Sequence, residues 1–151
     1  MQSLSIAHIN GLIESQLMSW HEAKRNFDRL MEIERKPLQL GDFRMAAQLN
    51  PARIRSTGAA VDRESVAARP CFLCKENRPA AQMSGEWPTP DWELLVNPYP
   101  ILPVHFTIAA KKHIPQENIP LEMAMMAECA PPLVFFFNGA KAGASAPDHL
   151  H

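Results

Sequence analysis

Two histidines separated by a single residue, His149 and His151, have the clearest capacity for chemistry in this sequence. Side chains alternate along an extended backbone, so this spacing puts both imidazoles on the same face. One imidazole can then react while the other binds a metal or orients its neighbour. The segment from Asn138 to Ser145 is rich in glycine and alanine, and such small residues let backbone N–H groups approach a phosphate closely. The combination predicts a nucleotide-phosphate site with a histidine nucleophile.

A second candidate site is the pair Cys71 and Cys74, which forms a C-x-x-C sequence. Such a knuckle presents two thiolates to one tetrahedral zinc ion, and two further ligands must come from elsewhere in the chain. The alternatives are a pair of reduced, partly buried thiols, or a redox motif, whose thioredoxin-like βαβ context is missing here. The donors available for the other two positions are His105, His113, His149, His151 and Cys129.

The composition limits the class of protein. A chain of 151 residues forms one domain or part of one. Its net charge of −1 and a pI near 6.6 predict neither a nucleic-acid partner nor binding to an acidic membrane. The longest apolar run, 131–137, is too short to span a bilayer, and the N-terminus lacks the features of a signal peptide. We therefore expect a cytoplasmic protein with no membrane or nucleic-acid partner.

The elements that position these residues follow from the hydrophobic pattern. Apolar residues recur near a 3.6-residue period over 5–33, which predicts one helix ended by Lys36-Pro37. In a predicted strand over 52–56, Arg53 and Arg55 point to the same side. Guanidinium groups can bind phosphate there, but an isolated pair of this kind is more often a solvated strand face. The order of elements predicts an α+β fold with an antiparallel sheet. The remaining expectations are strands at 43–49, 92–96, 103–110 and 133–137, a helix at 121–129, and loops at 57–69 and 77–90.

The order of these parts resembles galactose-1-phosphate uridylyltransferase and its relatives in the histidine-triad (HIT) superfamily. Those relatives include diadenosine tetraphosphate phosphorylases and GDP-hexose phosphorylases. The resemblance runs from about Phe43 to His151. The matching residues are, in chain order, Pro51, Arg53, Cys71, Cys74, Asn97, Pro100, His105, His113, Asn138, Gly143, Ser145, His149 and His151.

The resemblance implies a fold and a set of site residues. The fold is a HIT-like antiparallel β-sheet, a half-barrel with flanking helices and an N-terminal helix. An N-terminal helical segment occupies 1–40, and the nucleotidyltransferase domain occupies 41–151. That domain is expected to be incomplete and truncated at the C-terminus, because the family pattern continues His-x-His-x-Gln. The implied residues are His151 as the nucleophile, Asn138, Gly143, Ala144, Ser145 and Arg53 as phosphate-binding residues, and Cys71, Cys74, His113 and His149 as ligands of a structural zinc.

The resemblance also implies a reaction. A nucleotidyl group is transferred through a covalent nucleotidyl-histidine, from a nucleotide sugar or a dinucleoside polyphosphate. One alternative is a nucleotide phosphorylase of the diadenosine polyphosphate or GDP-hexose type, which uses inorganic phosphate as the acceptor. Another is an inactive, zinc-stabilised fragment or scaffold domain, which the missing glutamine favours. Because relatives of this type often dimerise, a homodimer is also implied.

Overall fold

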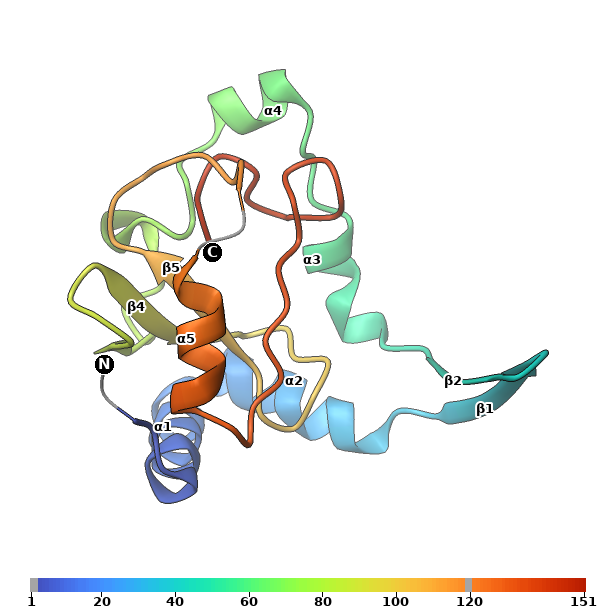
Figure 1. The fold of residues 1–151 in the computed structure, drawn as a ribbon. Helices are drawn as coiled ribbons and strands as arrows, with labels where there is room; N and C mark the ends of the chain where they lie inside the picture. Colours follow the sequence, from blue (N-terminus) through green and yellow to red (C-terminus); the bar gives the residue numbers. More distant parts are fainter. Residues whose placement is uncertain (1–2, 119–120) are drawn as a thin grey trace.

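The computed structural model describes residues 3–118 and 121–151, which form an α+β fold (Figure 1). Its main sheet has three antiparallel strands in the order β3 (Ser84–Glu86), β4 (Trp92–Val96) and β5 (Phe106–Ala110). Trp92 and Leu94 on β4 are buried in the largest hydrophobic cluster of the described residues. No helix in the two described ranges combines the length and apolar character that crossing a membrane requires.

The predicted helix over 5–33 is instead two helices, α1 (Ile6–Ser19) and α2 (His21–Glu32). Trp20 separates them, with an extended backbone at φ −121° and ψ 90°, and its side chain is 5 % exposed. Hydrophobic periodicity could not reveal this break, because the buried tryptophan falls in step with the apolar positions on either side.

Both helices pack against the sheet. Ile9 of α1 belongs to the cluster that contains Trp92, whereas Ile13 of α1 and Phe27 of α2 surround Val96 at the end of β4. The helix pair therefore shares its hydrophobic core with the strands that carry the candidate site.

An antiparallel hairpin follows the helices and projects away from the rest of the chain (Figure 1). It consists of β1 (Arg35–Leu40) and β2 (Phe43–Gln48), and every residue of the two strands is exposed. Gly41 at the turn has φ +58°, a conformation that favours glycine. The strand expected at 43–49 is confirmed, but Lys36-Pro37 lies within β1, so the helix already ends at Glu32.

The segment after β2 is helical, and the strand predicted at 52–56 is wrong. A 3-10 helix, η1 (Pro51–Arg53), leads directly into α3 (Ile54–Thr57). Proline fits the first position of a helix, where its missing N–H has no partner to lose. Arg53 and Arg55 therefore do not alternate along a strand.

Two predicted loops contain regular structure. The loop at 57–69 includes α4 (Arg63–Ala68), whose N-cap Asp62 accepts a 2.9 Å hydrogen bond from the Ser65 N–H. The loop at 77–90 includes β3, which pairs with β4. A 3-10 helix, η2 (Lys75–Asn77), follows the cysteine knuckle.

The sequence predicts the later elements with one exception. The strand at 92–96 is β4, the strand at 103–110 is β5 from Phe106 onward, and the helix at 121–129 is α5 (Glu122–Cys129). The strand at 133–137 is wrong, because this segment has no regular structure and Val134 is 83 % exposed. The end of β5 is bonded instead to the chain at Leu150, whose carbonyl accepts from the Ala110 N–H at 3.0 Å.

Candidate functional site

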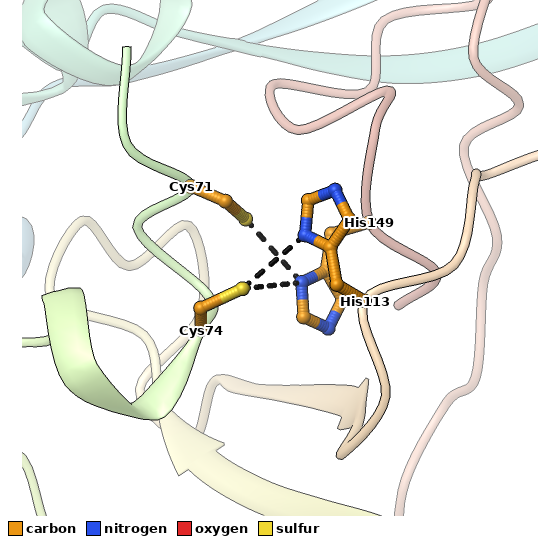
Figure 2. Close-up of side chains that lie close together, drawn as sticks. All are labelled: Cys71, Cys74, His113 and His149. Atoms are coloured by element: carbon orange, nitrogen blue, oxygen red, sulfur yellow. Dashed lines mark hydrogen bonds between the residues drawn. The ribbon is translucent and has the colours of Figure 1, made fainter.

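Cys71, Cys74, His113 and His149 come together in one cluster, with ligand atoms that all lie within 4.8 Å of one another (Figure 2). The Cys71 sulfur is 3.3 Å from Nδ1 of His149. The Cys74 sulfur is 3.2 Å from Nδ1 of His113 and 3.6 Å from Nδ1 of His149. Two thiols and two imidazoles in this arrangement could hold a metal ion. The four ligands predicted from the sequence are thus the four residues that the fold assembles.

The knuckle between the two cysteines is a hydrogen-bonded turn. The Cys74 N–H donates to the Cys71 carbonyl at 3.2 Å, and the Asn77 side chain donates to the same carbonyl at 3.0 Å. Leu73, inside the knuckle, packs with Leu95 of β4 and Ala109 of β5. This packing fixes both sulfurs against the sheet.

His149 has its ring orientation set by the backbone of β5. Its Nε2 lies 2.7 Å from the carbonyl oxygen of Ala110, and because a carbonyl can only accept, Nε2 carries the proton. Nδ1 of the neutral ring therefore has a free lone pair, and this atom faces the two sulfurs. The side chain is 1 % exposed, and burial lowers its pKa, which favours the neutral form that a metal ligand needs.

A carboxylate and a guanidinium lie behind the cluster. One oxygen of Asp148 is 3.8 Å from Nε2 of His113, and the other accepts a 3.2 Å bond from Nη2 of Arg69. The same Nη2 donates to the Ser145 carbonyl at 3.3 Å. Arg69 therefore connects the glycine-rich segment to Asp148, which lies beside the candidate ligand His113; such outer-shell contacts are common in metal sites.

The Cys74 thiol holds its proton at neutral pH. Burial, followed by the charge of Cys71, raises the pKa of Cys74 to about 11. A cation bound between the two sulfurs would reverse this effect, because coordination deprotonates a thiol. Metal binding at this cluster therefore releases protons.

His151 lies outside the cluster and is held by two neighbours. Its Nδ1 is 2.8 Å from the carbonyl oxygen of His149, so Nδ1 carries the proton and Nε2 has the lone pair. The Gln116 side chain accepts from the His151 N–H at 2.7 Å and donates to its main-chain oxygen at 2.9 Å. Burial lowers the pKa of the His151 imidazole. The two neighbouring histidines thus hold opposite tautomers.

A cavity of about 1120 Å³ has His151 in its wall. Ala144 in this wall is 3 % exposed, and Gly143 has φ +98°, which only glycine adopts readily. Burial lowers the pKa of Arg53, whose guanidinium remains charged. All the phosphate-binding residues expected from the sequence line the same cavity: Arg53, Asn138, Gly143, Ala144 and Ser145.

The remaining donors considered from the sequence are not part of the cluster. His105 is 8 % exposed, lines the cavity, and accepts a 3.3 Å bond at Nδ1 from the Ile101 N–H. Burial, with the charge of Arg53 as a second cause, lowers the pKa of His105 to about 4. Among the described residues, neither His105, His151 nor Cys129 joins the four ligands.

Sequence reasoning missed two residues that shape the site, Gln116 and Arg69. Each acts through groups that only the folded chain brings near: main-chain groups in the case of Gln116, and the Ser145 carbonyl and the Asp148 carboxylate in the case of Arg69. Gln116 follows His113 by three positions, and that proximity to a predicted ligand was the available signal.

The fold and the site define an α+β protein with a four-residue cluster that could hold a metal beside a large cavity. A family model described as Domain of unknown function (DUF4922) matches residues 12–151, and the chain belongs to this family. No curated protein and no solved structure matches the chain.

Proposed function

We propose that this chain carries a nucleotidyltransferase site, in which His151 accepts a nucleotidyl group covalently and a structural zinc ion holds the surrounding segments together. One observation carries the proposal. The Nδ1–H of His151 is bonded to the His149 carbonyl, so the lone pair of its neutral ring is on Nε2, and the residue lines the cavity. A neutral imidazole with a fixed tautomer is a competent nucleophile.

Zinc is the metal that best fits the cluster. In a tetrahedral site with Zn–S near 2.3 Å and Zn–N near 2.0–2.1 Å, sulfur and nitrogen lie roughly 3.6 Å apart. The three measured sulfur–nitrogen separations, 3.2, 3.3 and 3.6 Å, are close to this value. Four protein ligands leave no position for water, so the ion would contribute stability and not a reacting group.

The same geometry supports our inference of a HIT-like fold. The order β3, β4, β5 is antiparallel, and the chain at Leu150 bonds to the end of β5 at the sheet edge. This arrangement brings the His-x-His segment beside the cysteine knuckle.

The reaction proceeds in two displacements. The lone pair on Nε2 of His151 attacks the α-phosphorus of the nucleotide, a P–N bond forms, and the P–O bond to the leaving phosphate breaks with its electron pair. The ring becomes positively charged, and its Nδ1–H stays bonded to the His149 carbonyl, which stabilises that charge. An oxygen of the acceptor phosphate then attacks the same phosphorus and releases the neutral imidazole.

The cavity wall supplies the groups that would hold the phosphates. Small residues at 143–145 line the wall, where they would let a phosphate approach the backbone closely, and Arg53 provides a positive charge. A volume of about 1120 Å³ slightly exceeds the range of roughly 300–1,000 Å³ that is usual for a small-molecule site. The wall therefore suits a nucleotide with a second group attached, such as a nucleotide sugar or a dinucleoside polyphosphate.

The test is the intact mass of the zinc-loaded chain after incubation with UDP-glucose, GDP-mannose or diadenosine tetraphosphate. We expect a mass increment of one nucleotidyl group from at least one donor, with His151→Ala abolishing the increment. His8→Ala serves as the control, because His8 is an exposed residue of α1 and does not line the cavity. No increment from any donor, or an increment that persists in His151→Ala, would overturn the proposal. Discharge of the adduct by inorganic phosphate or by a sugar phosphate then separates a phosphorylase from a transferase.

A further inference from the structure

Gln116 is completely buried, at 0 % exposure, in the loop that follows His113. Its side-chain amide spans three segments of the chain. Nε2 donates to the main-chain oxygens of Asn138 and His151, both at 2.9 Å, and Oε1 accepts from the His151 N–H at 2.7 Å. Its backbone N–H donates to the Pro147 carbonyl at 3.1 Å, which anchors the loop to the segment before His149.

The orientation of the Gln116 amide is fixed by these partners. Exchanging Oε1 and Nε2 would bring an oxygen against two main-chain oxygens and an amino group against the His151 N–H. Both N–H donors of Nε2 are used, and Oε1 is paired, so the arrangement is satisfied in one way only. A buried polar network of this kind specifies one geometry.

We propose that Gln116 is the positioning residue for the histidine nucleophile, an inference that rests on the proposed function. Gln116 bonds both backbone groups of His151, and through the same Nε2 it holds the carbonyl of Asn138 at a constant distance from that histidine. It does not line the cavity, so it acts through the two residues that do. Reaction at His151 therefore depends on the Gln116 amide without any contact to the nucleotide.

Gln16 provides a matched control for this role. It is 1 % exposed, its Nε2 donates to the Ala81 carbonyl at 2.6 Å, and its Oε1 accepts from the Met83 N–H at 2.7 Å. Like Gln116, this buried amide on α1 donates to a main-chain carbonyl and accepts from a main-chain N–H. Gln16 also does not line the cavity. Substitution of either glutamine should therefore lower the free energy of unfolding by a similar amount. Only substitution of Gln116 should also slow the reaction at His151.

The experiment compares Gln116→Glu with Gln16→Glu in the zinc-loaded chain. Glutamate keeps the acceptor for the His151 N–H, but its second oxygen faces two main-chain oxygens. We expect the rate constant of adduct formation to fall by about 100-fold in Gln116→Glu, the effect of a misplacement of roughly 1 Å. Gln16→Glu should react at the wild-type rate, and nucleotide affinity should stay close to wild type in both. Equal rates in the two variants would overturn the proposal.

A second measurement separates this proposal from the proposed function. If the wild-type chain forms no adduct, amide hydrogen exchange of His151 decides. Faster exchange in Gln116→Glu and unchanged exchange in Gln16→Glu would show that Gln116 fixes His151, with only the chemistry refuted. Equal exchange in the two variants would refute the positioning role as well. If Gln116→Glu does not fold, Gln116→Asn, which retains the amide but is one methylene shorter, is compared with Gln16→Asn by the same criteria.

Discussion

Replacement of Cys74 by serine tests the metal centre most directly. Its sulfur approaches both imidazoles of the cluster, at 3.2 Å from His113 and 3.6 Å from His149. A serine hydroxyl is similar in size but is a poor ligand for zinc, which prefers thiolate, imidazole and carboxylate. Cys129→Ser is the control, because Cys129 lies outside the cluster.

The magnitude follows from comparing the metal-free and metal-loaded states. Without metal, the substitution removes two thiol contacts, which together stabilise the fold by about 2 kcal/mol at most. With zinc at about 1,000 times its dissociation constant, the wild-type chain gains about 4 kcal/mol in addition. For a chain of 151 residues, at about 2–4 °C per kcal/mol, that gain corresponds to roughly 8–16 °C in Tm.

The assay is metal content by mass spectrometry, combined with thermal unfolding in the presence and absence of a chelator. The wild-type chain and Cys129→Ser should each bind about one zinc ion. On chelation, the Tm of each should fall by roughly 8–16 °C. Cys74→Ser should bind none and should unfold at the same temperature with or without chelator. Stoichiometric zinc in Cys74→Ser, or a wild-type Tm that chelation does not change, would refute the reasoning.

Two further predictions concern residues around the site. The pKa of His105 is near 6.5 in the unfolded chain and about 4 in the folded chain. Because the unfolded chain therefore binds this proton more readily, the free energy of unfolding should fall as the pH drops from about 6.5 to about 4. The decrease in the free energy of unfolding should total about 3 kcal/mol. Urea titrations of His105→Gln should not show this decrease, and a pH profile identical to that of the wild-type chain would contradict the role given to His105. Arg69→Met should lower zinc affinity by about 10–100-fold, since Asp148 then loses the partner that holds it beside His113. Competition with a chromogenic chelator measures this, and unchanged affinity would exclude the outer-shell role.

The sequence predicted the cluster better than it predicted the fold around it. Cys71 and Cys74 carry their chemistry in their residue types and spacing, whereas His113 and His149 were selected from five possible donors by the family resemblance that the order of the motifs suggested. Strand β4 was predicted at its observed bounds, because a buried strand leaves a short apolar run between turn residues.

The errors fall where tertiary contacts decide the local structure. The segment at 133–137 has the composition of a strand, yet Leu150 makes the bond to the end of β5, and no local pattern encodes that choice. Trp20 interrupts the helix although the apolar periodicity continues through it, because its backbone is extended while its side chain is buried. Gln116 acts through backbone groups 22 and 35 positions away, which sequence spacing does not reveal.

The contact between β5 and the C-terminal segment has a consequence for self-association. Ala110 at the end of β5 is bonded to Leu150, and His149 is bonded to Ala110. The candidate ligand His149 therefore holds in place the segment that covers this end of the sheet. An uncovered strand edge is a template for pairing with another chain. A change that breaks the bond between His149 and Ala110 would loosen that cover and leave the end of β5 open to pairing with a second chain.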